Sequence, residues 1–537
     1  MADASSASFV LPRPQSGDLS GSVYLIAANG SMLNLPMPST SPRDPLNWSF
    51  DKRVRAFVSM IFFTVVALAE VEGPSLMLAG LSQEYASEET RPFHLDLLLS
   101  APTLFKGIGA FVWIPLSLAV GRRPVFLLCT IILLFATVLA IVSGNLYVRL
   151  VSVCLQGLSV GISSSTMLLM AIDLTFIHQR PQAIAIFMSL GPFPALLVLS
   201  VVPRITNGVL NWRTFYLMFM IPCITAVVLA FLFYPETYFL RPAVAFDGRV
   251  LVQSATEKVK VYEDWEKVPG GKTLPDMPAT SKWSATIKEL KIWGKTESGW
   301  EAMWACYPQI LLCMVNPLVF WVALLHAIVF GSLMSIGETY YTTLSGAPYF
   351  LPNNTIALVN LGAAFGVLLA WPTAGLMISM ISRHLAINNR GIRDAEHFLP
   401  AFVVPIISGI ASVTLYGLTV ENKWHPAWVY IAYTLNGLSV SSLAVANTLW
   451  ITEAFPRWAA PALAVLGGWS YIASFGTSYA IFPWIKSQGY ARMNIEIALM
   501  IFVVGGMIVP VAFWGKSVRQ YIHGRLGMNE AGALRPQ

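Results

Sequence analysis

The sequence predicts an all-α polytopic membrane protein in which twelve transmembrane helices form two six-helix halves. Of its residues, 55% are hydrophobic and 12% are charged, whereas a soluble domain carries about 25% charged residues. The longest stretch without a hydrophobic span covers residues 241–300 and is rich in Lys, Glu, Pro and Gly. Six long apolar stretches precede this polar segment and six follow it. The chain is therefore divided into two hydrophobic halves by a polar connection.

The N-terminal part of the chain holds a polar tail and the first six spans. Residues 1–50 are rich in Ser, Pro, Gly and Asn and lack the basic-then-apolar pattern of a signal peptide, so we expect a disordered tail. A spanning helix needs about 20 apolar residues. In the first half, residues 51–240, the stretches that satisfy this condition are 54–80, 95–120, 124–144, 146–176, 181–203 and 214–234.

The polar connection, residues 241–309, contains one periodic feature. Trp283, Ile287 and Leu290 recur at helical spacing within a basic stretch. This pattern predicts either a short amphipathic helix on the inner leaflet or a solvated linker helix. In the second half, residues 310–515, the predicted spans are 310–341, 355–381, 398–420, 427–452, 459–485 and 495–513, and residues 516–537 form a second tail.

The orientation follows from the basic residues, because Lys and Arg are retained on the cytoplasmic side. With the N-terminal tail inside, most of the 34 Lys and Arg fall on that side, including Arg180 and Arg393 in short loops. We therefore predict that both termini are cytosolic. The sequence Asn353-Asn354-Thr355 then lies outside, which makes Asn353 a candidate N-glycosylation site.

Five ionisable side chains lie within the predicted spans, where such groups are costly and usually face a cavity or a partner. They are Glu70, Glu72, Lys106, His326 and Glu338. Glu70 and Glu72 lie about 200° apart around a helix, so at most one faces a cavity squarely. We favour Glu70 as the proton carrier because it lies deeper from the outer mouth.

The other ionisable side chains have alternative interpretations. Glu338 is either the counterpart of Glu70 in the second half or a residue of the outer rim. His326 is either a proton carrier or a hydrogen-bonded packing residue, and Lys106 pairs with a carboxylate of the first span. The polar and aromatic residues expected to line a substrate cavity are Asn360, Asn436, Asn447 and Trp450.

Several short motifs occur in an order known from one family. The turn after the second span reads Gly121-Arg122-Arg123-Pro124-Val125, the first half closes with Tyr234-Pro235-Glu236-Thr237, and the first span follows Asp44-Pro45-Leu46-Asn47-Trp48. Over residues 44–515 this arrangement resembles the major facilitator superfamily, and the last two motifs resemble its fungal twelve-span drug:proton antiporter branch. Leu118 and Val153 depart from the family pattern, which usually has an Asp and an Arg at these positions.

The conserved turn of that family contains the charges that predict a cytosolic gate. Guanidinium groups form bidentate pairs with carboxylates, and Asp173 and Glu236 are expected at the same face as the two arginines of the turn. We predict a latch that holds the inner mouth shut; the alternative is a set of basic anchors without gating. The predicted latch residues are Arg122, Arg123, Asp173, Glu236 and Arg241.

The resemblance implies a secondary active transporter that works by alternating access, with its site near the bilayer midplane. Proton-coupled efflux of a small organic molecule, a drug or secondary metabolite, is the first hypothesis. Proton-coupled uptake of a cationic nutrient such as a polyamine is the second, and a non-transporting sensor on the same fold is the third. The resemblance also implies the plasma membrane.

The sequence argues against other classes of protein. It contains no zinc-type His spacing, nucleophile elbow or phosphate loop, so we predict no enzymatic activity, cofactor or metal. The expected partners are a small-molecule substrate, protons and the lipid bilayer, with no nucleic acid. We expect a monomer.

Overall fold

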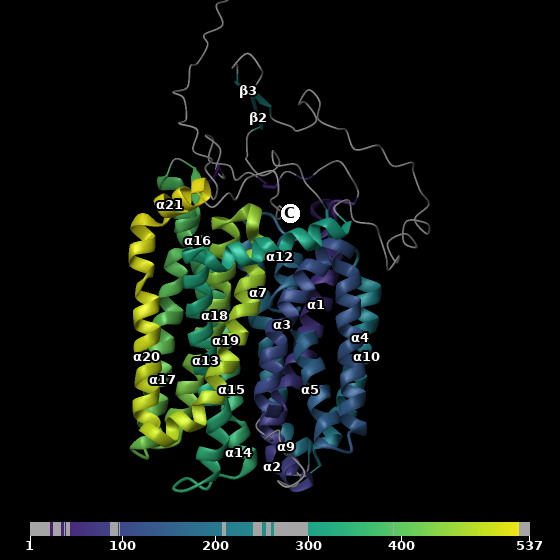
Figure 1. The fold of residues 1–537 in the computed structure, drawn as a ribbon, viewed down its shortest axis with the longest axis vertical. Helices are drawn as coiled ribbons and strands as arrows, with labels where there is room; N and C mark the ends of the chain where they lie inside the picture. The colour runs from purple at the N-terminus through teal and green to yellow at the C-terminus, as the bar shows by residue number, and fades with distance from the viewer. Residues whose placement is uncertain are drawn as a thin grey trace, which may run out of the picture.

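The computed structural model describes residues 22–24, 34–36, 38, 43–85, 95, 97–206, 211–239, 250–253, 259–262, 299–389 and 391–525. Long helices run side by side in two groups, an N-terminal group and a C-terminal group (Figure 1). Among the described residues, ten helices are long and apolar enough to cross a membrane. The predicted all-α fold in two helical halves is confirmed.

The first half is built from helices that break at Gly and Pro. Gly73 and Pro74 separate α1 from α2, and Gly191 and Pro192 separate α7 from α8, because proline lacks the N–H that a continuous helix needs. The helices of this half are α1 Phe50–Glu72, α2 Pro74–Glu84, α3 Leu97–Val120, α4 Arg122–Val142, α5 Leu146–Val160, α6 Thr166–Asp173, α7 Arg180–Leu190, α8 Pro192–Leu199, α9 Val202–Ile205 and α10 Trp212–Phe233.

The second half contains longer helices and one π-helical turn. Its elements are α13 Pro317–Ser345, α14 Asn353–Ala357, α15 Val359–Ala370, η4 Trp371–Leu376, α16 Met377–Asn388, β4 Ile392–Asp394, η5 Ala395–Phe402, α17 Val403–Glu421, α18 Ala427–Ala454, η6 Pro456–Trp458, α19 Ala459–Gln488, α20 Tyr490–Gly506 and α21 Ile508–Arg525.

Two of the twelve predicted spans are absent from the ten apolar helices. The fourth span is interrupted after Val160, which leaves α5 with 15 residues. The eleventh, α19, is 30 residues long but carries Ser470, Ser474 and Ser478. The first two of these hydroxyls donate to the carbonyl oxygens of Ala323 and Ala327 on α13, at 2.8 and 3.1 Å. The low hydropathy of α19 therefore reflects its packing against α13.

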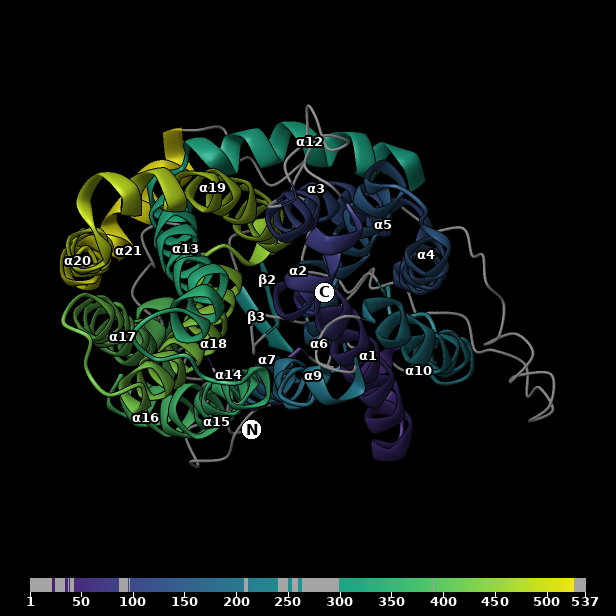
Figure 2. The same cartoon turned by 90° about the horizontal axis from the view of Figure 1, so that it is seen from below.

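The predicted seventh span, 310–341, differs from the structure at its start. The chain breaks at Asn316, whose side-chain oxygen accepts the N–H of Leu318 at 3.0 Å and caps α13. The preceding helix, α12 (Gly299–Val315), lies across one end of the bundle instead of crossing it (Figures 1 and 2). The amphipathic helix predicted around Trp283, Ile287 and Leu290 lies outside the described residues.

The chain before α1 differs from the expected disordered tail in two short stretches. β1 (Ser22–Tyr24) pairs antiparallel with β4, with Val23 opposite Arg393. The carbonyl oxygen of Leu35 accepts the backbone N–H of Ile177 at 2.6 Å. A short 3₁₀-helix, η1 (Pro45–Asn47), precedes α1, and the polar connection contributes a separate hairpin, β2 (Val250–Gln253) with β3 (Val259–Tyr262).

The two halves meet closely along α3 and α19. A Cβ atom added at Gly107 of α3 would lie 2.7 Å from the carbonyl oxygen of Gly468 on α19, so only glycine allows this approach. Exposed apolar side chains instead cover the outside of the bundle, for example Phe135, Ile221, Ile407 and Phe502. This distribution is typical of a surface that faces lipid.

Candidate functional site

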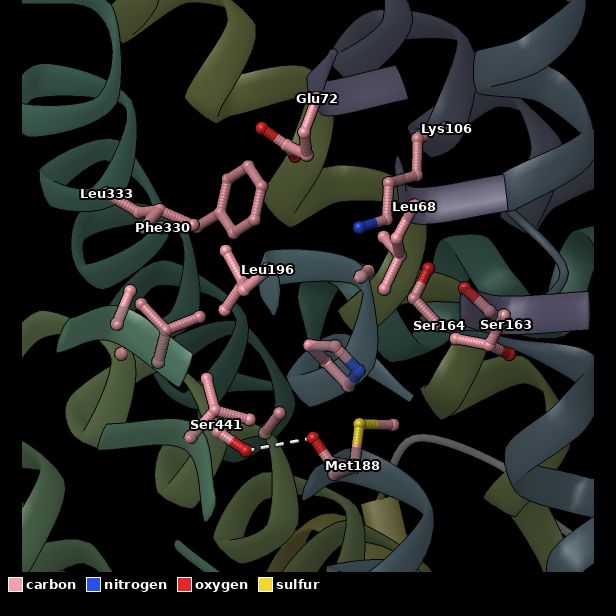
Figure 3. A pocket seen from close by; sticks show the side chains of 18 of the residues that line it. Leu68, Glu72, Lys106, Ser163, Ser164, Met188, Leu196, Phe330, Leu333 and Ser441 are labelled. Atoms are coloured by element: carbon pink, nitrogen blue, oxygen red, sulfur yellow. Dashed lines mark hydrogen bonds between the residues drawn. The ribbon is translucent and has the colours of Figure 1, made fainter. Parts of the chain in front are cut away.

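A cavity of about 160 Å³ lies between the two halves. Its wall combines side chains of α1, α3, α7 and α8 with side chains of α13, α15, α18 and α19. The wall is mostly apolar, and the charged side chains that line it are Glu72 and Lys106 (Figure 3). A hydrogen bond from the hydroxyl of Ser441 to the carbonyl oxygen of Met188, 3.0 Å long, joins the halves beside the cavity.

Lys106 points into this cavity from α3. Its ammonium group lies 4.1 Å from the ring centre of Tyr471 and 5.2 Å from that of Phe330, so it makes cation–π contacts with the second half. Within the described chain it forms no ion pair, and the carboxylate of Glu72 accepts no hydrogen bond there. The predicted pairing of Lys106 with a carboxylate of the first span is therefore absent from the described chain, and two opposite charges face one cavity without contact.

Glu70 occupies a different environment from Glu72. Its side chain is fully buried inside the first half, where its carboxylate accepts hydrogen bonds from Thr137 at 2.8 Å, Gln156 at 2.9 Å and Cys223 at 3.1 Å. Glu72, two residues on, lines the cavity. As the helix geometry predicts, one carboxylate of the pair faces the cavity, and it is Glu72.

Of the remaining predicted cavity residues, His326 lines the wall, and the three asparagines lie behind it. His326 lines the cavity, and its Nδ1 is 3.1 Å from the amide nitrogen of Asn447. The amide of Asn436 donates to Ser332 at 3.0 Å, and that of Asn360 donates to Tyr340 at 3.3 Å.

Three other predicted site residues lie away from the cavity wall. The indole of Trp450 packs edge-on against Trp321. Glu338, toward the far end of α13, accepts a hydrogen bond from Ser478. The side-chain oxygen of Asn353 accepts the hydroxyl of Tyr341 at 3.0 Å.

The predicted latch residues cluster at one end of the first half. We call the end of the bundle at which α1 begins and α21 ends the inner end (Figure 1). There, Arg122 lies 3.4 Å from Asp173, and Glu236 accepts the backbone N–H groups of Arg122 at 2.8 Å and Arg123 at 3.2 Å. Arg241 lies outside the described residues. The described contacts of this cluster tie α4, α6 and the segment after α10 to one another.

Glycine is required in this cluster at position 121. Its φ is 100°, and an added Cβ would lie 2.3 Å from an oxygen of Glu236. Burial raises the pKa of Glu236, while the N–H groups of Tyr238, Arg122 and Arg123 lower it. The turn is thereby fixed against the end of α10.

A second charged cluster joins the two halves at the inner end, and the sequence did not reveal it. Glu453 of α18 lies 3.6 Å from Arg180 of α7 and 2.8 Å from Arg393 of β4. Arg393 also donates to the carbonyl oxygen of Ile177 in the first half, at 3.4 Å. All three side chains are at most 7% exposed. We call Arg180, Arg393 and Glu453 the inner clasp.

Two helical halves around a central cavity are the architecture of many secondary transporters. The sequence model of the Major Facilitator Superfamily matches residues 54–478. The chain belongs to this superfamily.

Individual relatives agree with this assignment. The chain is 23% identical to an uncharacterized MFS-type transporter of Schizosaccharomyces pombe, over 93% of this chain and 90% of the relative. It is 23% identical to the efflux pump radE of Floropilus chiversii, over 89% and 83% of the two chains. The solved structure of the proton:xylose symporter XylE superposes with a TM-score of 0.56 at 14% identity, over 87% of this chain and 94% of that one, which supports the fold.

Proposed function

We propose that this protein is a proton-coupled transporter that works by alternating access and exports a small organic molecule. The observation that carries the proposal is the cavity between the halves, lined by Glu72 and Lys106, together with the inner clasp that joins the halves at the inner end. Sites of this kind lie near the bilayer midplane at the interface of the repeats. The name of the relative radE, an efflux pump, favours export.

Glu72 is the proton carrier in this proposal, in place of Glu70. A carrier has to exchange protons with water in the cavity, and Glu72 faces the cavity while Glu70 is fully buried with several donors. Protonation removes the charge of Glu72, which changes its attraction to Lys106 and to any charged substrate. Binding of a proton and binding of substrate are thereby coupled through one carboxylate.

Uptake of a cationic nutrient is the second candidate, and the carboxylate of Glu72 is the feature in its favour. Lys106 opposes it, because a positive charge in the same cavity repels a cation. Lys106 also covers the aromatic faces of Tyr471 and Phe330 that would attract one. The charges of the cavity therefore favour a neutral or anionic organic molecule.

The proposal is tested by reconstituting the purified protein in liposomes with an acidic lumen. Fluorescein, an organic anion, and rhodamine 6G, an organic cation, serve as probes. We expect accumulation of at least one probe in the lumen, in exchange for protons, and its loss when a protonophore collapses the gradient. Accumulation only with an alkaline lumen would indicate proton symport and uptake, and no gradient-dependent accumulation of either probe would contradict the proposal.

The proposed membrane arrangement has the inner end in the cytosol, as the distribution of Lys and Arg predicts. The family resemblance implies the plasma membrane. A reporter fused after Arg525, at the end of α21, should then behave as cytosolic. A protease or glycosylation tag inserted after Asn353, at the start of α14, should be accessible from outside. An external signal from the first fusion would reverse the assignment.

A further inference from the structure

The segment before α1 contacts both halves of the protein at the inner clasp. β1 pairs through its backbone with β4, where Val23 lies opposite Arg393. Leu35 accepts the backbone N–H of Ile177, in the loop between α6 and α7, at 2.6 Å. One of these contacts lies on the second half and the other on the first.

Both contacts involve residues that join the two halves at the inner end. Arg393 forms an ion pair with Glu453 and donates to the carbonyl oxygen of Ile177. The backbone N–H of the same Ile177 is donated to Leu35. Arg393 and Ile177 contact each other, and the segment binds both of them. Val23 pairs with Arg393, and Leu35 binds Ile177.

The side chain of Leu35 is also buried. It is 1% exposed, whereas the neighbouring Asn34 is exposed. Burial of one leucine side chain contributes about 1.5–3 kcal/mol of favourable free energy in general. A substitution at Leu35 should therefore weaken the contact of this segment, whereas one at the exposed Asn34 should not.

We propose that the two described stretches before α1, residues 22–24 and 34–36, act as a strap that stabilises the conformation in which the inner end is closed. Closing brings the loop of Ile177 against β4, and ordering of flexible loops costs conformational entropy. The strap holds β4 as one strand of a sheet and holds Ile177 by a hydrogen bond, so it reduces this cost. Because linkage is reciprocal, removing the strap favours opening of the inner end.

The test reads conformation directly and needs no substrate, so it does not depend on the proposed function. Thr448 lines the cavity near the end of α18 and is 1% exposed. In a Cys154→Ser background, T448C is labelled with a membrane-impermeant maleimide from the inner side and from the outer side of oriented vesicles. Opening of the inner end should raise the first rate and lower the second.

Deletion of residues 1–42 should raise the rate of inner-side labelling about tenfold, the change that one or two net hydrogen bonds give. Leu35→Asp in the full chain should act in the same direction. Asn34→Asp adds the same charge at an exposed neighbouring position and should leave the rate unchanged. A synthetic peptide of residues 19–40 should restore protection to the deletion variant, and the same peptide with Leu35→Asp should not.

Two outcomes would overturn the strap. Equal inner-side labelling of the full chain and the deletion variant would show that the segment does not bias the conformation. A rise in labelling from both sides together would show general loosening of the fold instead of a shift between two conformations.

Discussion

Replacing Glu453 by alanine should open the inner end of the protein. Arg180 and Arg393 are buried and both lie against this carboxylate, and the contact with Arg180 joins the two halves. Removing one partner of a buried ion pair costs about 3–5 kcal/mol because a charge remains without its counter-ion. At 1.4 kcal/mol for each factor of ten, the ratio of inner-closed to inner-open protein should fall by roughly 10² to 4 × 10³-fold.

The measurement is the two-sided labelling of T448C described above. Inner-side labelling should rise and outer-side labelling should fall in Glu453→Ala. The matched control is Glu396→Ala, which removes a carboxylate 3.1 Å from Arg519 at the same end but within the second half. Unchanged labelling in Glu453→Ala would mean that the inner clasp does not hold the halves together.

Glu72→Gln should abolish accumulation of substrate against its gradient while exchange of substrate across the membrane continues. The amide keeps the size of the side chain and can form hydrogen bonds, but it does not take up or release a proton at physiological pH. Flux driven by a proton gradient should then fall to the level of liposomes without a gradient.

Glu70→Gln is the contrasting variant, with the same chemical change two residues away. Gln156 and Thr137 donate to Glu70. In the variant, the new amide nitrogen would face one of these donors and could not accept its hydrogen bond. We expect a loss of stability of about 1–3 kcal/mol, measured as a lower Tm, with proton-driven accumulation retained. If Glu70→Gln loses uphill accumulation and Glu72→Gln keeps it, the roles of the two carboxylates are reversed.

The two helical halves and most of the span positions were predictable because hydrophobic length and turn residues are local properties of the sequence. Gly73 and Pro74 interrupt the apolar stretch 54–80, and the structure ends α1 there. Asn316 was missed as a break, because an apolar stretch continues across it and only the cap of α13 marks the change in direction.

The site was predictable only in part, since it depends on helix rotation and on contacts between distant residues. Helical spacing predicted that Glu70 and Glu72 face different directions, but not which of them faces the cavity. Asn360, Asn436 and Asn447 were expected to line the cavity, but none of them is among the residues of its wall, and their hydrogen-bond partners place them behind it. No sequence pattern marked Glu453 as part of an ion-pair cluster, because Arg180 and Arg393 lie on other elements, far from it in the sequence.

The position of α12 sets how the inner end can open. This helix packs against α3 of the first half and α19 of the second half, and it lies on the opposite side of the bundle from α7 and α16 (Figure 2). Separation of α3 from α19 would break the packing of α12 against one of them. On the side of α7 and α16, the halves are joined by the inner clasp and the strap. The halves should therefore rotate as rigid bodies about a hinge at the α3–α19 contact, with α12 lying along the hinge. A molecule that enters from the inner side would then pass between α7 and α18, beside Arg180. The positive charge of Arg180 would act on the charge of the molecule at the start of this route.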